Sequence, residues 1–364
     1  MELYGIIEEI RYRKICEQEL EEENECKINN WKNTLCYKGM AVAKWGSPKR
    51  TKTYPYARVY DIIQNENCPH KYVSIIPIIK YESKKERNYL QWDTISLMNL
   101  LNIYVILAWF EEVSWKNKSK ILNKSLNEEK ICSDLNRLEK YHSSALHWNY
   151  KQLENIQEIF IKAINVYKNL DKDLVSDCIV ERNLTRFSEN FKEFSRTLSH
   201  QAQDRESRIE QPTEALSRKG EKSKITIKNF QGGVYYFTVD EVYYENSILR
   251  LVESKHTSKS KLPSIGDIKD GLLKMILYCS ISKLKIKDKD KFKDIEKFKP
   301  TLRLTSSKLP KDFYIDENMK EVEIEEKLKK VKLSSKNINF IKDCLMKEAK
   351  ENKFSVIIEY GETK

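Results

Sequence analysis

Three charged residues in the C-terminal half have the types and the spacing that metal-dependent hydrolysis requires. Asp240 and Glu253 lie in two apolar stretches separated by Asn246-Ser247, a dipeptide that suits a two-residue hairpin turn. With that turn, Asp240 lies directly opposite Glu253, and Lys255 falls on the same face of the sheet two residues further on. Two carboxylates and one ammonium group should therefore converge on one patch.

This set of side chains has a definite chemical use. Two hard carboxylates can hold Mg²⁺, or Mn²⁺ in its place, and leave coordination positions for water and a phosphate oxygen. The ion lowers the pKa of its water and stabilises the charge that builds up at phosphorus. Lys255 would orient the attacking water or offset phosphate charge. The spacing alone leaves one alternative open, a cross-strand charge cluster that only stabilises the sheet.

The length of the turn decides which acid joins the patch. Asp240 and Glu241 are neighbours, so their side chains point to opposite faces of a strand. A three-residue turn at 245–247 would put Glu241 on the face of Glu253 instead. We expect the two-residue turn, because Asn tolerates the positive φ that it requires, and we expect Glu241 to be a surface charge on the opposite face.

The residues around the patch predict the elements that hold it. The strands are expected at 224–230, 234–244, 248–256, 301–305 and 354–360. A helix should follow the third strand, with Ser264 as its N-cap and Asp267 in the capping-box position, and a second helix should span 336–352. This order indicates an α/β (α+β) fold, with a mixed β-sheet flanked by helices.

The segment from about 214 to 305 resembles the PD-(D/E)xK nuclease superfamily, and type II restriction endonucleases in particular. The matching residues are Val239-Asp240, Glu253-Ser254-Lys255 and the helix that follows Pro263-Ser264. Val239 stands where the family pattern has proline. The resemblance implies Asp240 and Glu253 as metal ligands and Lys255 as the catalytic lysine.

The same resemblance implies two further positions. Members of the superfamily often carry an acidic metal ligand on the preceding helix, and Glu214 occupies the matching place. A polar residue on the following helix is also common, and Asp267 or Lys274 could fill that position. Mg²⁺ is the implied cofactor.

The residues before about 210 predict a more helical organisation. A charged segment over 1–40 and amphipathic stretches from about 119 to 200 favour helices. Thr94 to Phe110 has the length of a buried helix, and Tyr72 to Lys80 predicts a buried strand.

A polar stretch at 201–222 marks a boundary between two domains. We expect a mainly helical N-terminal region, 1–210, that supplies DNA recognition and dimer contacts. The nuclease core should span 211–364.

The charge distribution indicates a polyanionic partner. The 364 residues carry 66 Lys plus Arg against 55 Asp plus Glu, and residues 211–364 hold 33 of the former and 24 of the latter. A basic half of this kind most often binds nucleic acid. The candidate phosphate contacts are Lys49, Arg50, Lys52, Lys259 and Lys261. The lysine-rich stretch 283–299 is either a DNA contact or a solvated loop, and we favour the loop.

The cysteines and the apolar runs exclude other classes of protein. Eight cysteines are spread along the chain with no CxxC pair, so no zinc motif is present. Cys68-Pro-His70 is the nearest approach to a ligand pair, but isolated buried thiols are much commoner. We expect reduced cysteines and a cytoplasmic location. We also expect no contact with a membrane, because no uncharged apolar run is long enough to span one and no signal-peptide pattern is present.

The function expected from these observations is sequence-specific cleavage of double-stranded DNA by a Mg²⁺-dependent endonuclease of the restriction type. A palindromic target would require a two-fold homodimer. A repair, junction-resolving or signal-activated defence nuclease with the same core is an alternative. A non-catalytic nucleic-acid-binding protein is another.

Overall fold

A computed structural model describes the chain at residues 1–15, 19–44, 56–68, 70–78, 92–117, 120–171, 203, 220–289 and 291–362. It divides into two compact units. The C-terminal unit combines Met1–Gln18 with Gln201–Lys364, and the inserted unit comprises Glu19–His200. Within the described ranges, no helix is both long enough and apolar enough to cross a membrane.

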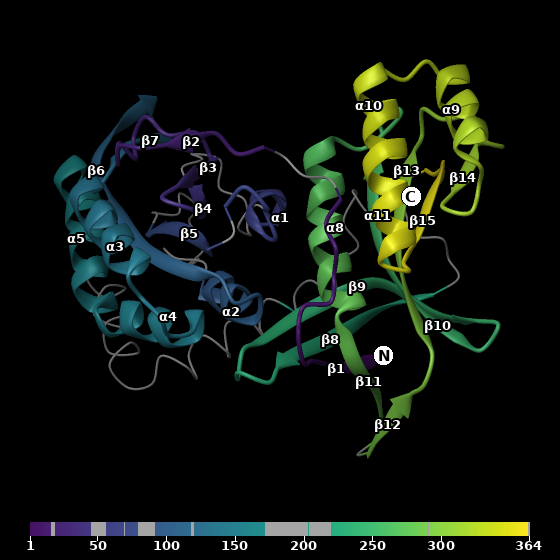
Figure 1. The fold of residues 1–364 in the computed structure, drawn as a ribbon, viewed down its shortest axis with the longest axis horizontal. Helices are drawn as coiled ribbons and strands as arrows, with labels where there is room; N and C mark the ends of the chain where they lie inside the picture. Colours follow the sequence, from purple (N-terminus) through teal and green to yellow (C-terminus); the bar gives the residue numbers. More distant parts are fainter. Residues whose placement is uncertain are drawn as a thin grey trace. The chain divides into compact units, whose positions relative to one another are not determined.

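The C-terminal unit is built on a nine-stranded mixed sheet (Figure 1). In sheet order the strands are β12 (Lys291–Ile295), β11 (Ile281–Asp288), β1 (Glu2–Ile7), β8 (Glu221–Asn229), β9 (Val234–Glu245), β10 (Ile248–Thr257), β13 (Phe298–Ser306), β15 (Ser355–Tyr360) and β14 (Tyr314–Asp316). β1 runs parallel to β8, and β13 runs parallel to both β10 and β15. The expected mixed α/β architecture is confirmed.

Strand β1 corrects the prediction of a charged helix over residues 1–40. Its residues alternate between exposed or half-buried and buried positions, as a strand with one buried face does. β1 pairs with β8 on one side and with β11 on the other. The N-terminal eighteen residues are therefore grouped with the C-terminal unit rather than with the region 1–210 to which the sequence analysis assigned them.

The hairpin of β9 and β10 and the helix after it form as expected. The hairpin turn consists of Asn246 and Ser247, whose φ values of 49° and 65° are those of a type I′ turn. Helix α8 (Ile265–Cys279) begins with a capping box. The hydroxyl of Ser264 accepts from the backbone N–H of Asp267, and the Asp267 carboxylate accepts from the backbone of Ser264.

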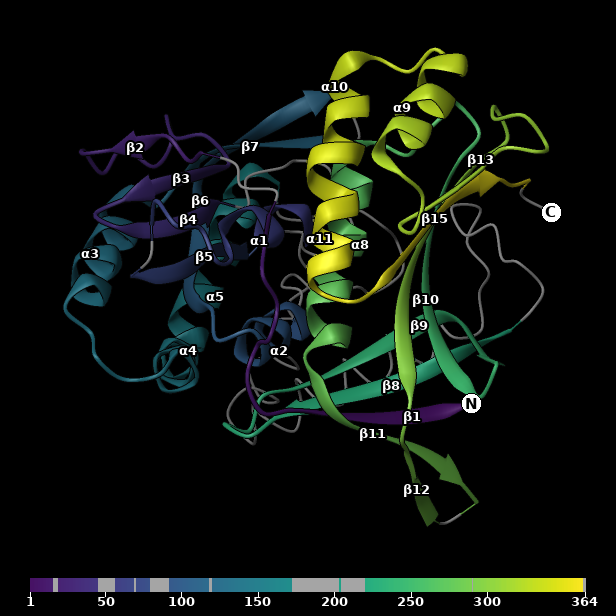
Figure 2. The same ribbon diagram turned by 45° about the vertical axis from the view of Figure 1, so that its right-hand side comes forward.

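The remaining helices of this unit follow β14. They are α9 (Glu321–Lys330), α10 (Ser335–Asn339), a π-helical turn η2 (Phe340–Met346) and α11 (Lys347–Glu351). The helix expected at 336–352 is therefore present but widens to π geometry in its middle. The helix from α10 to α11 runs beside α8 in both views (Figures 1 and 2).

The lysine-rich stretch 283–299 is not a loop. It forms the antiparallel ribbon β11–β12, in which Leu284 is buried and pairs with Ile295. Leu284 and Ile295 lie on one face of the ribbon, whereas Phe292 lies opposite Lys287 on the other face and is 52% exposed.

The described residues of the inserted unit also form a sheet, so the mainly helical organisation expected for the N-terminal region is not evident there. Its six strands, in order, are β2 (Glu22–Glu23), β3 (Thr34–Tyr37), β4 (Met40–Lys44), β5 (Lys71–Ile78), β6 (Tyr104–Asn117) and β7 (Lys120–Leu126). β4, β5 and β6 are parallel. The helices are α1 (Tyr56–Ile62), α2 (Trp92–Leu100), α3 (Glu128–Glu139), α4 (Ala145–Glu154) and α5 (Ile156–Leu170). The last three pack on β6.

The buried helix expected at 94–110 ends early and continues as a strand. α2 stops at Leu100, and Asn102 takes a left-handed φ of 56°. The N–H of Ile103 donates to the carbonyl of Met98 at 2.9 Å, which closes the helix in a Schellman motif. Asn at the left-handed position is the signal that the sequence analysis overlooked.

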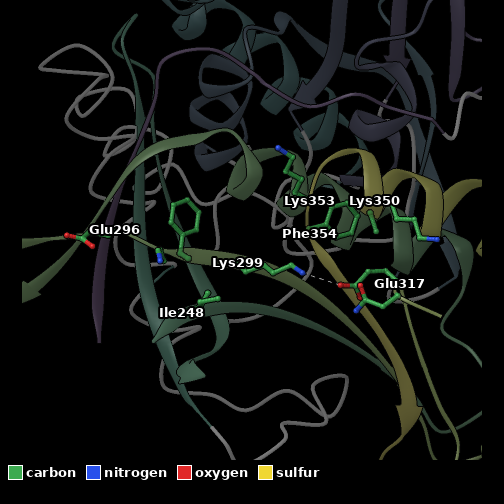
Figure 3. A pocket seen from close by; sticks show the side chains of 11 residues that line it. Ile248, Glu296, Lys299, Glu317, Lys350, Lys353 and Phe354 are labelled. Atoms are coloured by element: carbon green, nitrogen blue, oxygen red, sulfur yellow. Dashed lines mark hydrogen bonds and ion pairs between the residues drawn. The ribbon is translucent and has the colours of Figure 1, made fainter. Parts of the chain in front are cut away.

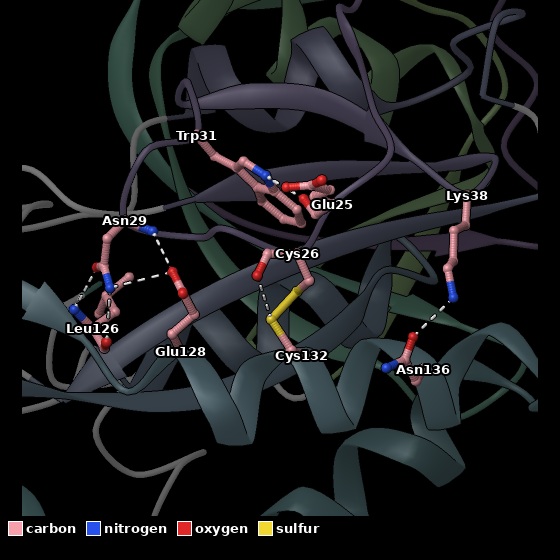
Figure 4. The surroundings of a disulfide bond; sticks show 9 residues. All are labelled: Glu25, Cys26, Asn29, Trp31, Lys38, Leu126, Glu128, Cys132 and Asn136. Atoms are coloured by element: carbon pink, nitrogen blue, oxygen red, sulfur yellow. Dashed lines mark hydrogen bonds between the residues drawn. A yellow bond between two sulfur atoms is a disulfide. The ribbon is translucent and has the colours of Figure 1, made fainter.

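The inserted unit holds two disulfides, so the expectation of reduced cysteines is wrong for four of the eight. Cys26 is bonded to Cys132 on α3 (Figure 4), and Cys36 is bonded to Cys68. Asn29, three residues after Cys26, also holds this segment, because its side chain exchanges hydrogen bonds with the backbone of Leu126. Cys68 in a disulfide cannot act as a thiolate ligand beside His70.

Candidate active site

The register of the β9–β10 hairpin places Asp240 and Glu253 side by side. The strands pair as far as Glu241 opposite Val252, and the next residues on the two strands are Asp240 and Glu253. The Asp240 carboxylate accepts a hydrogen bond of 2.8 Å from the backbone N–H of Ser254. The register expected from a two-residue turn is confirmed, and Asp240 rather than Glu241 shares a face with Glu253.

Glu253 lies at the centre of a buried charge cluster. Only 1% of the residue is exposed. Its Oε1 lies 2.9 Å from Nζ of Lys255, and its Oε2 lies 2.7 Å from Nζ of Lys274. One carboxylate therefore joins two ammonium groups, one from its own strand and one from α8.

Helix α8 brings Lys274 to the sheet because a glycine allows close packing. A Cβ on Gly271 would lie 2.6 Å from Leu302 Cδ1 and within 4 Å of side-chain carbons of Lys255 and Glu253. Without a side chain at that position, the helix backbone can rest against β10 and β13. Lys274 then also donates to the carbonyl of Thr238 at 3.2 Å, which fixes its ammonium group.

The cluster keeps all three of these groups charged. Burial works to raise the pKa of Glu253, but the charges and hydrogen bonds of Lys255 and Lys274 outweigh it and hold that pKa below its usual value. Burial works in the opposite direction on the lysines, and the Glu253 carboxylate outweighs it, so the pKa of Lys255 is raised and that of Lys274 is raised well above its usual value. The cluster is therefore made of ions at neutral pH.

We call the face of the sheet that carries Asp240, Glu253 and Lys255 the front face. Lys255 is the most accessible of its charged groups, with 24% of its side chain exposed, whereas Lys274 retains 13%. A phosphate that approaches the front face would therefore reach Lys255 before Lys274.

The structure brings together some of the expected site residues and separates others. Asp240, Glu253 and Lys255 lie together, and Lys274 joins them from α8. Asp267, the other candidate on that helix, lies outside the cluster and caps the first turn. Glu214, the expected third metal ligand, lies outside the described residues.

Of the five residues expected to contact DNA, the structure describes two. Lys49, Arg50 and Lys52 lie outside the described residues. Lys259 is exposed after β10, as a phosphate contact should be. Lys261 is half-buried and donates to the backbone carbonyl of Val331, so its ammonium group is already engaged within the unit.

The donor chemistry of the front face suits Mg²⁺, but the donor set is small. Across the described ranges, no group of three or more His, Cys, Asp or Glu side chains has metal-binding geometry. Asp240 and Glu253 are two hard oxygen ligands on one face, and Mg²⁺ commonly binds through one or two carboxylates with water in the remaining positions. The two lysines balance the two carboxylates, so an added divalent ion would leave the site positive and would favour an anionic substrate.

The chemistry of the opposite face is not evident from the sequence. Glu241 was expected at the surface, but it is fully buried. One of its carboxylate oxygens lies 3.5 Å from Arg303 on β13, and Arg303 also contacts Glu359 on β15 at 2.6 Å. We call this side of the sheet the rear face. No local pattern around Glu241 reveals it, because its partner comes from a strand about sixty residues away in the sequence.

Comparisons of this chain with protein-family models, with curated proteins and with solved structures gave no match. Any function of the chain must therefore be inferred from the geometry and chemistry of the two faces of the sheet.

Proposed function

We propose that the chain is a Mg²⁺-dependent endonuclease that cleaves double-stranded DNA at specific sites, in the manner of type II restriction enzymes. The observation that supports this proposal is the front face, where Asp240, Glu253, Lys255 and Lys274 form one buried cluster. Lys255 lies at its rim with 24% of its side chain exposed, and the chain as a whole has a net charge of +11, which favours binding to DNA.

The residues of the front face have separate roles in this proposal. Asp240 and Glu253 would hold the metal ion, which supplies an activated water and stabilises negative charge on the phosphate. Lys255, at the rim, contacts the scissile phosphate and positions the attacking water. Lys274 acts as a positioning residue, because its bonds to Glu253 and to the Thr238 carbonyl fix the carboxylate from below.

Two further properties belong to this proposal. A homodimer would place two front faces on opposite strands of a palindromic site. The location would be cytoplasmic, as is usual for an enzyme that acts on intracellular DNA. The two disulfides of the inserted unit oppose that location, because cytosolic thiols are normally kept reduced. An alkylating reagent added to intact cells blocks the free thiols of the protein. Counting the blocked thiols then shows whether the four cysteines are reduced, as a cytoplasmic location requires, or disulfide-bonded.

The decisive experiment is cleavage of a sequenced plasmid by the purified protein in the presence of Mg²⁺, with the product ends mapped. We expect fixed ends without an activating nucleotide. Asp240→Ala should lower the cleavage rate by at least about a hundredfold, while DNA binding without metal persists. Glu241→Gln is the matched control on the neighbouring residue, because Arg303 keeps Glu359 as a partner, and it should lower the rate by less than about tenfold. If neither variant loses cleavage, the nuclease site lies elsewhere.

One observation favours a second function, that of a non-catalytic nucleic-acid-binding protein. Both oxygens of Glu253 are bonded to lysines, which is also the arrangement of a charge cluster that only stabilises the sheet. Titration of the DNA complex with Mn²⁺ separates the two functions. Saturable binding that Asp240→Ala abolishes supports the nuclease, and the absence of binding supports the second function.

A further inference from the structure

A pocket of about 420 Å³ opens on the rear face of the sheet. It is formed by side chains of β9, β10, β13, β14 and β15 that alternate with those of the front face. Its charged residues are Glu241, Glu245, Arg250, Lys299, Arg303, Asp316, Glu317 and Glu359, and its aromatic residues are Tyr243, Tyr314 and Tyr360. We call it the rear pocket, and nothing in the proposed nuclease mechanism uses it.

The cations of the rear pocket are already neutralised. Arg250 pairs with Glu245 at 2.9 Å, and Lys299 pairs with Glu317 at 3.3 Å. Arg303 is held between Glu241 and Glu359. An anionic ligand would therefore have to displace a carboxylate from every cation that it reached.

The carboxylates outnumber the cations, so the pocket has a negative potential. Asp316 has no lysine or arginine within ion-pair distance among the residues that the structure describes. Burial and the neighbouring Asp316 raise the pKa of Tyr314 to about 12, and burial and Glu245 raise that of Tyr243. Burial is the larger cause in both cases, and the negative charges of Asp316 and Glu245 act in the same direction. The pocket thus attracts a cation.

Two buried polar atoms that line the pocket have no hydrogen-bond partner within the described part of the chain. They are Oγ1 of Thr301 and Nε of Arg250. Thr301 is only 2% exposed, and it lines the pocket from β13. Buried polar atoms are nearly always bonded, so an unpartnered hydroxyl and an unpartnered N–H on two residues that line the same pocket indicate groups that a ligand completes. The Arg250 Nε–H needs an acceptor, and the Thr301 hydroxyl can serve as either donor or acceptor.

We propose that the rear pocket binds a small hydroxylated amine, of the amino-sugar or amino-alcohol class. The protonated amine matches Asp316 and the negative potential, and the tyrosine rings add favourable cation–π contacts. A hydroxyl oxygen of the same ligand accepts from Arg250 Nε and bonds to Thr301. A plain diamine lacks the acceptor, and a nucleotide carries the wrong charge. This proposal is independent of the nuclease activity.

A neighbouring cavity has the opposite character and provides a contrast (Figure 3). It measures about 640 Å³, and its lysines are Lys297, Lys299, Lys350 and Lys353, against Glu296 and Glu317. Figure 3 shows Lys299 bonded to Glu317, a pair that both cavities share. Inorganic phosphate should prefer this lysine-rich cavity to the rear pocket, so it serves as the anionic control.

The test is calorimetric titration of the full chain at about 150 mM salt, where weak surface attraction is screened. The probes are glucosamine and the two-ring amino sugar neamine, and glucose is the control that lacks the ammonium group. We expect one saturable site for at least one probe, no binding of glucose, and no competition by phosphate. Absence of saturable binding by both probes, or equal binding of glucose, would overturn the proposal.

Two near-isosteric variants locate the site. Thr301→Val and Asp316→Asn should each weaken probe binding by about fivefold or more, since each removes one polar contact. Asp294→Asn is the control, because Asp294 is 76% exposed on β12 and does not line the pocket. Thermal unfolding without ligand checks that each variant is folded. If the three variants bind the probe equally, binding occurs elsewhere and the proposal is wrong.

Discussion

The front and rear faces of one sheet show how adjacent residues can serve different chemistry. Asp240 and Glu241 are neighbours in β9, and both are buried. On the front face, Glu253 is shared by two lysines, so carboxylates and ammonium groups balance. On the rear face the reverse holds, because Glu241 and Glu359 share a single arginine. Strand alternation alone therefore separates a site suited to phosphate from a pocket suited to a cation.

The largest expected effect comes from removing the charge at the centre of the front face. Glu253→Gln leaves two ammonium groups facing a neutral amide, so we expect a loss of about 3–5 kcal/mol in the free energy of unfolding. Cleavage should fall by at least about a hundredfold, because a metal ligand is lost. Urea denaturation and the plasmid assay measure the two effects. Wild-type stability in this variant would show that the cluster contributes nothing to the fold.

The corresponding substitution on the rear face, Glu241→Gln, should lower the free energy of unfolding by less than Glu253→Gln does. Glu241→Gln leaves Arg303 paired with Glu359, so we expect a loss of about 1–3 kcal/mol in the free energy of unfolding, because only one of the two buried ion pairs of Arg303 is removed. Cleavage should change by less than about tenfold. Equal destabilisation by Glu241→Gln and Glu253→Gln would contradict this explanation. It would mean that the number of charged partners left behind does not set the loss of stability on the two faces.

Acid should remove the stability that the front face contributes only below the usual pKa of a glutamate. The pKa of Glu253 is lowered from its usual value of 4.5, so the stability that it contributes is present above that value and is lost as the pH falls through the lowered pKa. The urea unfolding midpoint of the wild type should therefore fall as the pH is lowered below 4.5. Glu253→Gln should have a shallower decline. Parallel curves for the two proteins would contradict the lowered pKa.

The smallest effect concerns the helix that covers only the front face. Ser264→Ala removes the N-cap of α8, at a cost of about 1 kcal/mol. Amide hydrogen exchange should increase in the first turn of α8 and stay unchanged on β14, which borders the rear pocket. An equal increase on β14 would mean that the two faces do not respond independently.

The local features of the front face could be predicted from the sequence. Asn246-Ser247 and the alternation on either side of it fixed the hairpin register, and Ser264 with Asp267 fixed the start of α8. The rear pocket could not be predicted, because Glu241 and Arg303 meet only through the order of strands in the sheet. That order depends on long-range pairing, which leaves no periodic signal in the chain.

The position of β1 has a consequence for how the protein is made. β1 lies between β8 and β11, yet the whole inserted unit separates it from both in the sequence. A ribosome that adds about 5–20 residues per second needs roughly ten seconds or more to reach β8 after it has completed β1. During that interval neither sheet partner of β1 has been made, while the inserted unit is synthesised in full. Because Asp240 and Glu253 are made only afterwards, a nascent chain carries no front face until most of it has been translated.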